Sequence, residues 1–229
     1  MIDVHVCHMP GEVCTIFDNG VLASIDDITI YEHESVPGDI MRTRIEAFRT
    51  GHSDYVSFVD PDDEVLEDGF NPCLDILDRN RHSFVFTNSY REGEANTSTP
   101  MYDKQAQWRI DWHMKTMVPA HQIVVMRRDM LEIALREIER QTELLAHTKY
   151  QELQVIYAHL VRQAPAFLLS NIFPYRWNAV SGNQARKKAL DTDEKFIVEY
   201  IKKVLYGIRY KPEAPYDHPN PTALHRYKK

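Results

Sequence analysis

The sequence has few cysteines and no long apolar run, and both shortages narrow the class of protein. Only three cysteines, Cys7, Cys14 and Cys73, occur among the 229 residues. An odd and sparse set of this kind indicates free thiols in a reducing compartment. No run of 18 apolar residues is present, so no transmembrane segment is expected. The N-terminal stretch MIDVHVCHMPGEV lacks the basic start of a signal peptide, and we therefore expect a cytoplasmic location.

Several well-known catalytic motifs are missing as well. The chain has no G-x-S-x-G, P-loop or G-x-G-x-x-G pattern, so serine hydrolases, P-loop kinases and dinucleotide-binding enzymes lose their usual markers. Soft metal ligands do occur near the N-terminus, namely His5, Cys7, His8 and Cys14. They lack paired C-x-x-C spacing and lie partly on alternating faces of one expected strand, so the pattern does not favour a zinc site.

Charge is unevenly distributed along a chain of otherwise ordinary globular composition. Hydrophobic residues make up 43% and charged residues 27%, with a net charge of −7. Residues 1–100 contain 20 acidic and 6 basic side chains, whereas residues 101–229 contain 14 and 21. The resulting balances of −14 and +7 either mark two halves that face different ligands or reflect a few solvated helices.

Short apolar runs alternate with amphipathic segments in the first 90 residues. The segment 37–51 begins with Pro-Gly-Asp and places Met41, Ile45 and Phe48 at helical spacing. On the same criteria we expect strands at 2–7, 27–31, 55–59 and 82–90 and a second helix at 71–80. This alternation predicts an α/β protein with a parallel sheet, whose ligand crevice lies at the carboxyl ends of the strands.

The pattern becomes more helical after residue 90. We expect strands at 121–126 and 167–177, helices at 127–147, 150–164 and 193–210, and a Pro-rich basic tail at 211–229. The boundary near residue 95 is polar and loop-like, and we interpret it as a separation between two lobes of one domain.

An acidic burst follows the third expected strand in DYVSFVDPDDEVLEDG, residues 54–69. Asp60 and Asp62 stand two residues apart across a turn, so both can offer oxygens to one hard cation such as Mg²⁺ or Mn²⁺. An EF-hand is excluded, because the positions that need Gly and Glu hold Val65 and Asn71. The other interpretation is a solvated acidic turn that caps the following helix.

The segment RTRIEAFRTGHSDYVSFVDPDD, residues 42–63, resembles a stretch of the family-two glycosyltransferases. That stretch reads approximately A-R-N-x-G-x-x-x-A-x-G-x-Y-I-x-F-L-D-x-D-D. Positions shared with it are Arg44, Tyr55, Phe58, Asp60, Asp62 and Asp63, whereas Ile45 replaces the family's Asn. Weaker similarities at 5–10, 28–35, 121–132 and 175–186 extend the resemblance over roughly residues 1–190.

The resemblance implies a GT-A fold, which is a Rossmann-like α/β architecture with a mostly parallel central sheet, flanking helices and a helical C-terminal region. It divides the chain into a donor-binding half (1–95), an acceptor-binding and catalytic half (96–190), and a C-terminal helix with a basic tail (191–229). The acidic run would bind Mn²⁺ or Mg²⁺, which grips the diphosphate of a nucleoside diphosphate sugar. Asp62 is the first choice as metal ligand, and Asp60 binds the metal, its water or the ribose.

Three further residues receive donor-binding roles from the resemblance. Glu32 falls where a family carboxylate reads the nucleotide base, and Pro10 lies in the loop that cradles that base. Arg44 neutralises the acidic cluster or the diphosphate. The alternative for Arg44 is a helix-surface position, paired with Glu46 or Asp39.

The catalytic base of an inverting transferase is a carboxylate that takes the acceptor proton. In the family, an E-D or D-D pair at the start of a helix supplies it. Glu152 is the nearest counterpart, although Leu153 stands where the second acid occurs. An exposed Glu in an amphipathic helix is the other interpretation of Glu152, and Asp111 and Glu143 are the remaining candidates for the base.

The leading hypothesis is therefore a metal-dependent inverting glycosyltransferase that moves a sugar from a nucleoside diphosphate sugar, above all a UDP-sugar, to an acceptor hydroxyl. Two alternatives stay open: a Mg²⁺-dependent nucleic-acid-processing enzyme with a strand-end D-x-D, and a non-catalytic carbohydrate- or protein-binding module. The basic second half indicates a polyanionic acceptor, such as an acidic glycan, a lipid-linked sugar or a hydroxylated base in modified DNA. The acidic first half would weaken non-specific DNA binding, so an ordinary saccharide acceptor ranks slightly above DNA.

Overall fold

The computed structural model describes the first half of the chain almost completely and the second half in part. The described residues are 1–37, 39–87, 89–92, 99–100, 123–141, 144, 152–164, 166–169, 172–178, 196–197, 199–201 and 203–204. Asp111, Glu143 and the basic tail lie outside these ranges. In the described part of the chain, no helix is long and apolar enough to cross a membrane.

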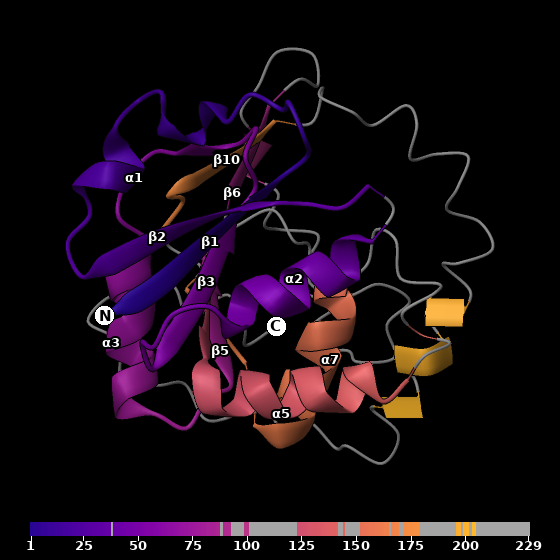
Figure 1. Ribbon diagram of the computed structural model, residues 1–229. Coiled ribbons are helices and arrows are strands. Elements are labelled where there is room, and N and C mark those ends of the chain that lie inside the picture. The colour runs from indigo at the N-terminus through magenta and orange to yellow at the C-terminus, as the bar shows by residue number, and fades with distance from the viewer. Residues whose placement is uncertain are drawn as a thin grey trace.

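A six-stranded sheet forms the centre of the molecule, with the strand order β2-β1-β3-β8-β5-β9 (Figure 1). Its strands are β1 (Ile2–His8), β2 (Ile28–Glu34), β3 (Tyr55–Val59), β5 (Phe84–Thr87), β8 (Val124–Arg127) and β9 (Phe167–Leu169). β1 pairs in parallel with both β2 and β3, and β5 pairs in parallel with β9. Because β8 alone runs antiparallel to its neighbours in this sheet, the prediction of a mostly parallel sheet is confirmed.

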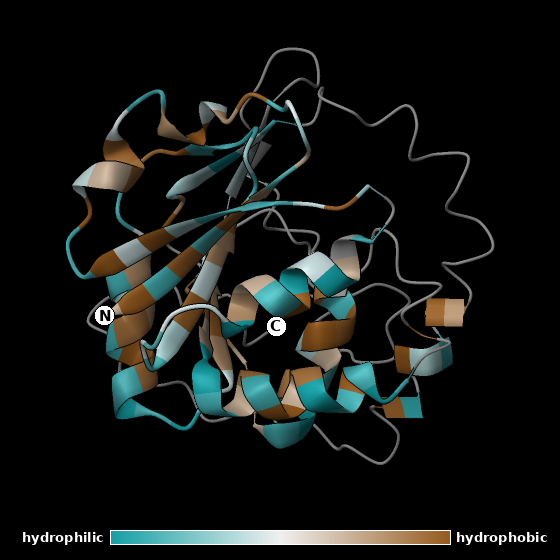
Figure 2. Cartoon of the chain, in the orientation of Figure 1, coloured by the Kyte–Doolittle hydropathy of each residue, from teal (hydrophilic) through white to brown (hydrophobic). Residues whose placement is uncertain are grey.

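Helices cover both faces of the central sheet. One face carries α2 (Ile40–Arg49), α5 (Arg128–Glu139) and α7 (Glu152–Gln163), and the other carries η1 (Thr15–Phe17), α1 (Val21–Ser24) and α3 (Phe70–Arg79). Successive residues of a strand point to opposite faces of the sheet, and each face carries its own hydrophobic core. Phe84 and Phe86 belong to the core on the first face, whereas Val85 belongs to the core on the second. Figure 2 shows bands of hydrophobic and hydrophilic residues both along the central strands and on the helices that flank them.

A smaller sheet has the strand order β4-β10-β6-β7. Its strands are β4 (Glu64–Val65), β6 (Ser89–Glu92), β7 (Thr99–Pro100) and β10 (Tyr175–Asn178). β4 begins one residue after Asp63 and pairs antiparallel with β10, in the register Tyr175 to Val65. This pairing brings a late segment of the chain to the acidic burst after β3.

A buried charged pair closes the edge where the parallel strands begin. The Asp3 carboxylate accepts hydrogen bonds from Arg128 Nη2 at 2.5 Å and from Ser53 N and Oγ at 2.9 and 2.7 Å. Asp3 is 1% exposed. Gly51 has φ +86°, and a Cβ added there would lie 2.1 Å from Asp3 Oδ2, so a side chain at this position would clash. The network fastens the start of α5 to β1, away from the carboxyl ends of the strands.

Two apolar runs that we expected to form single strands each divide between the two sheets. Residues 82–90 give β5 in the central sheet and β6 in the small one, and residues 167–177 give β9 and β10 in the same way. The prediction of single strands was therefore wrong. β5 ends at Thr87 and β9 at Leu169, directly before the polar residues Asn88 and Ser170-Asn171, and the prediction extended one strand across each of these short polar stretches.

The helices of the second half are shorter than expected or only partly described. The segment 127–147 forms α5, which ends at Glu139, where Gln141 N–H bonds to the Ile138 carbonyl. The predicted helix at 150–164 is confirmed as α7. In the segment 193–210, the described residues between 196 and 204 are helical.

Candidate functional site

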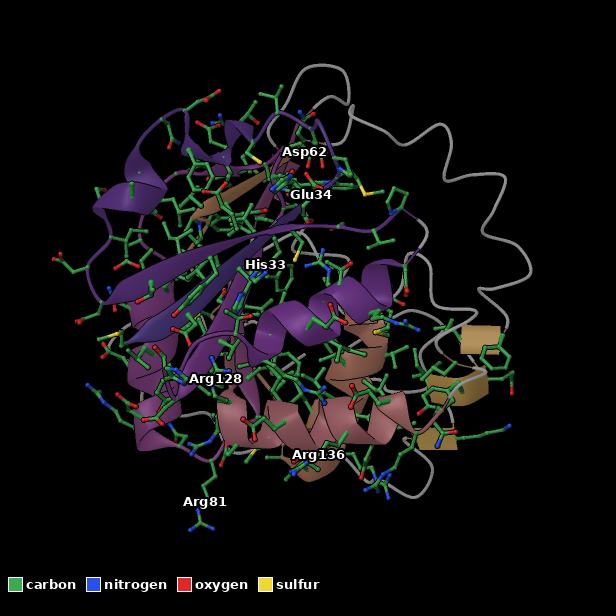
Figure 3. All side chains as sticks on the ribbon, in the orientation of Figure 1. His33, Glu34, Asp62, Arg81, Arg128 and Arg136 are labelled. Atoms are coloured by element: carbon green, nitrogen blue, oxygen red, sulfur yellow. The ribbon has the colours of Figure 1, made fainter. Side chains whose placement is uncertain are left out.

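The carboxyl ends of three parallel strands meet at one edge of the central sheet. His8, Glu34 and Val59 are the last residues of β1, β2 and β3. The acidic turn, residues 60–63, follows β3 directly, and Figure 3 shows Asp62 and Glu34 at this same end of the strands. In open α/β sheets this edge is where ligands bind.

Asp63 ties the acidic turn to β10. Its carboxylate is 3% exposed and accepts a hydrogen bond from Tyr175 Oη at 2.7 Å and from Asn178 N at 2.8 Å. Tyr175 Oη also accepts a hydrogen bond of 3.0 Å from Asp60 N. Burial, followed by the charges of Asp63 and Asp60, raises the pKa of Tyr175 well above its usual value, so the hydroxyl stays protonated and can donate.

Arg44 reaches the acidic turn from α2. Its Nη2 donates to Asp60 Oδ1 at 2.9 Å, and its guanidinium carbon lies 4.8 Å from the centre of the Phe58 ring. The Arg44 side chain is 4% exposed, so it is not a surface arginine of α2. Asp39, which we considered as its partner, instead pairs with Arg42 at 3.3 Å.

The chemistry of the acidic turn fits a hard divalent cation. Asp60 and Asp62 are partly buried, and their side chains offer the carboxylate oxygens that Mg²⁺ and Mn²⁺ prefer. Asp63 differs, because its two oxygens bind Tyr175 and Asn178. The turn thus combines two carboxylates at the ligand edge with one that fixes the backbone.

A tight turn after β1 carries Pro10. Glu12 N donates to the Met9 carbonyl at 3.0 Å, and Met9 N donates to Glu12 Oε2 at 2.7 Å. Pro10 and Gly11, with φ +76°, occupy the central positions, as in a type II turn. Pro10 is exposed at this turn. Further along the loop, Ile16 N donates to the carbonyl of Pro61 at 3.0 Å, which joins the loop to the acidic turn.

A group of metal-ligating side chains lies beside this loop. The ligand atoms of His8, Cys14 and Glu32 are all within 4.8 Å of one another. Burial, and then the charges of Glu32 and Glu12, raise the pKa of Cys14. Of the four N-terminal soft ligands, only His8 and Cys14 belong to this group, and their third neighbour is the carboxylate of Glu32 from β2, which the sequence did not indicate.

His5 lies in the core of the fold. It is fully buried between Tyr31 and Phe48, with ring centroids 5.4 and 5.7 Å away. His5 Nδ1 lies 3.0 Å from His33 Nε2. Burial, followed by the neighbouring His33, lowers the pKa of His5 to about 3, and burial also lowers the pKa of His33. Both rings are therefore neutral near neutral pH.

Glu152 is the first residue of α7. The last turn of α7 lies where the parallel strands begin, because Ser83 Oγ, just before β5, donates to the Ala164 carbonyl at 2.7 Å. A 12-residue helix is about 18 Å long, so the axis of α7 extends from there across much of the sheet toward the opposite edge. The topology thus directs the start of α7 toward the edge that carries the acidic turn.

The sequence profile described as glycosyl transferase family 2 matches residues 21–142, slightly more than half of the chain. The chain belongs to this family. The match includes β2, α2, β3 and the acidic turn, and therefore most of the site just described. No curated protein sequence gives a significant match.

Solved structures similar to this family 2 chain include TarS from S. aureus. TarS 1–349 in complex with UDP has a TM-score of 0.61 and 14% identity, over 92% of the present chain and 67% of that chain. The complex of TarS 1–349 with UDP-GlcNAc has a TM-score of 0.59 and 14% identity, over 92% and 68%. The present chain covers only 40% of the chain in another TarS structure. These likenesses confirm the GT-A fold.

The fold of this family 2 member brings the predicted donor residues to one region. The elements that carry them lie at the carboxyl edge of the central sheet: the loop with Pro10 follows β1, Glu32 lies near the end of β2, and the acidic turn follows β3 and contacts α2 through Arg44. Sequence reasoning missed the contribution of Tyr175, whose only signal was a weak match of the Tyr-Arg pair to a late family element. It also missed the approach of Cys14 to Glu32, which depends on the path of a loop.

Proposed function

We propose that this chain is a metal-dependent, inverting glycosyltransferase that transfers a sugar from a UDP-sugar to an acceptor hydroxyl. The observation that carries the proposal is the acidic turn at the carboxyl edge of β3, with Asp60 held by buried Arg44, in a chain of glycosyl transferase family 2. The complexes of TarS with UDP and UDP-GlcNAc support a uridine nucleotide as donor.

The donor would lie along the carboxyl edge of β1, β2 and β3. Asp60 and Asp62 would hold Mn²⁺ or Mg²⁺, which supplies a Lewis acid for the negative charge of the departing diphosphate. Glu32 would accept a hydrogen bond from an N–H of the base, and the turn with Pro10 would lie beside the base. Arg44 would keep the Asp60 carboxylate oriented through its charge-assisted hydrogen bond.

The acceptor hydroxyl needs a general base, and Glu152 is our assignment for it. A carboxylate at the first residue of a helix is stabilised by the helix dipole and by the free N–H groups of the first turn. A second carboxylic acid is unnecessary, because a nucleoside diphosphate leaves without protonation. Transfer with inversion then follows from direct attack of the hydroxyl on the anomeric carbon.

We propose a saccharide as the acceptor, with a polyanion such as hydroxylated DNA as the second choice. The net charge of +7 over residues 101–229 supports an anionic acceptor, while the −14 of residues 1–100 opposes non-specific DNA binding. Acceptor affinity measured at low and moderate salt distinguishes the two. A polyanion requires a steep loss of affinity with salt, and a flat response removes it.

The activity is tested with a panel of nucleotide sugars, each with and without Mn²⁺, scored by thermal stabilisation and by donor hydrolysis. UDP-sugars should stabilise the protein in the presence of Mn²⁺, and Asp62→Ala should abolish this effect. If no nucleotide sugar binds under any metal condition, the proposed function is wrong. If Asp62→Ala still binds and turns over the donor, the acidic turn does not have the proposed role in metal and donor binding.

A further inference from the structure

Three chemically different metal ligands converge from three segments at the base-binding end of the carboxyl edge. His8 ends β1, Cys14 precedes η1 and Glu32 belongs to β2, and their ligand atoms lie within 4.8 Å of one another. Val6 is the parallel partner of Glu32, so His8, two residues beyond Val6, faces the same side of the sheet. His8 and Cys14 are partly buried and Glu32 is exposed, which leaves the group open to solvent.

The hydrogen bond made by His8 leaves Nε2 as the ring nitrogen that can bind a metal. His8 Nδ1 lies 3.2 Å from the carbonyl oxygen of Met9. A carbonyl oxygen only accepts, so Nδ1 carries the proton and the lone pair of the neutral ring is on Nε2. Metal-binding histidines commonly have this arrangement, in which the second ring nitrogen donates to a backbone carbonyl.

The loop that carries Cys14 is fixed at both ends. The turn from Met9 to Glu12 is closed by two hydrogen bonds of 3.0 and 2.7 Å, and Ile16 N bonds to the Pro61 carbonyl at 3.0 Å. Cys14 therefore stays close to His8 and Glu32. In a tetrahedral zinc site the ligand atoms are about 3.3–3.8 Å apart, given metal–ligand bonds of about 2.0–2.3 Å. Small side-chain rotations would close the present spacing.

We propose that His8, Cys14 and Glu32 bind one Zn²⁺ ion, separately from the cation of the acidic turn, and that this zinc competes with the nucleotide donor. A thiolate, an imidazole and a carboxylate form a donor set that suits Zn²⁺ and leaves the fourth position to water. Mg²⁺ and Mn²⁺ prefer oxygen ligands and would select Asp60 and Asp62. The two sites would therefore bind different metal ions.

Competition with the donor rests on the proposed function, in which Glu32 accepts a hydrogen bond from the base. A zinc ion bound to Glu32 would occupy the carboxylate that otherwise accepts the hydrogen bond from the base. It would also place a positive charge where the base would lie. Zinc binding itself does not depend on the protein being a transferase. The two parts are therefore measured separately.

The site is tested by titrating the full chain with Zn²⁺ in the absence of nucleotide. Co²⁺ is used in parallel, because a thiolate bound to Co²⁺ gives a near-ultraviolet charge-transfer band. Cys14→Ser should remove the band, and Cys14→Ser and His8→Ala should each weaken Zn²⁺ binding by more than the roughly 10–100-fold loss typical of an outer-shell change. Glu34→Gln, which removes a carboxylate charge from the same strand as Glu32 but not a proposed ligand, is the control and should bind Zn²⁺ within about threefold of wild type. Circular dichroism verifies that each variant is folded.

Two results of the zinc titration would overturn the site: unchanged affinity in both Cys14→Ser and His8→Ala, or a loss of zinc binding in Asp62→Asn alone. Competition is measured as UDP affinity in Mn²⁺ with and without added Zn²⁺. Zinc should weaken UDP binding to wild type and leave the Cys14→Ser variant unaffected. Equal UDP affinity with and without zinc would refute the competition. If UDP binds under none of the conditions, the proposed function is refuted, and the zinc titration still tests the zinc site on its own.

Discussion

Tyr175 donates a 2.7 Å hydrogen bond to Asp63, although 112 residues separate them in the sequence. The same hydroxyl accepts a hydrogen bond from Asp60 N. One buried phenol therefore holds both ends of the acidic turn, from a strand of the small sheet. The acidic turn is therefore held by Tyr175 of β10 as well as by its connection to β3.

Replacing Tyr175 with Phe should lower the free energy of unfolding by about 2–3 kcal/mol, because a buried carboxylate and a backbone N–H lose their partner. Urea denaturation gives the value. Tyr55→Phe is the matched control, since it removes an exposed Tyr–Asp hydrogen bond, to Asp78, and should cost about 1 kcal/mol or less. Similar losses in the two variants would show that the Tyr175 contact has no special role.

Asp62→Asn should reduce transfer by about a hundredfold or more, because the metal loses a charged ligand close to the departing diphosphate. The expected signature is a loss of Mn²⁺-dependent UDP affinity, measured by calorimetry, with little change in stability. Asp75→Asn, at an exposed position of α3, carries the same change of charge and should behave as wild type. Equal Mn²⁺ dependence in wild type and Asp62→Asn would contradict the assignment.

Glu152→Gln should lower kcat by about 10²–10⁴-fold, the range typical of a lost general base. Donor affinity should be unchanged, because the amide keeps the size of the side chain and the donor lies on the strands. Steady-state kinetics and UDP titration separate these two quantities. Glu132→Gln, at an exposed position of α5, is the control. Unchanged turnover in Glu152→Gln would assign the base to another residue.

The buried His5 should make the protein less stable in acid. Because its pKa is about 3 in the folded protein and 6.5 in the unfolded chain, only the unfolded chain takes up a proton between these values. His5 therefore leaves the free energy of unfolding unchanged above pH 6.5. It lowers that free energy as the pH drops toward 3, by about 2–3 kcal/mol at about pH 4.5. His5→Phe should reduce the difference in unfolding free energy between neutral and acidic pH, whereas exposed His52→Gln should not. An identical pH dependence in wild type and His5→Phe would exclude His5 as the source.

Gly51→Ala should be much more destabilising than Gly20→Ala. Both glycines have positive φ, +86° and +68°, and alanine in that conformation costs about 1–2 kcal/mol. Only at Gly51 would the new Cβ meet Asp3 Oδ2, at 2.1 Å, whereas at Gly20 nothing lies within 4 Å. The difference between the two variants in denaturation experiments measures the clash. Equal losses would mean that the Asp3 network adjusts freely.

Local patterns predicted the elements whose residues contact near neighbours in the sequence. The spacing of Met41, Ile45 and Phe48 gave α2, and the apolar run at 55–59 gave β3. The location of the acidic turn could also be predicted, because the end of a strand determines where the next residues lie. Arg44 was recognised as a candidate, but its pairing with Asp60 had an equal alternative in the sequence.

Contacts between distant segments were beyond the reach of these patterns. The antiparallel direction of β8 depends on how the chain crosses the fold, and a strand of either direction has the same alternation. The division of 82–90 and 167–177 between two sheets and the bond from Tyr175 to Asp63 have the same origin. Such features are decided by packing between segments rather than by the residues of one segment.

The placement of β4 directly after the acidic turn has a consequence for genetics. Glu64 pairs with Arg176 both in strand register and by a side-chain hydrogen bond, so β10 and the turn shift together. A random-mutagenesis screen for loss of the activity of the turn should therefore recover two groups of alleles, near codons 60–65 and 175–178, with the same phenotype. Suppressors of one group should map to the other.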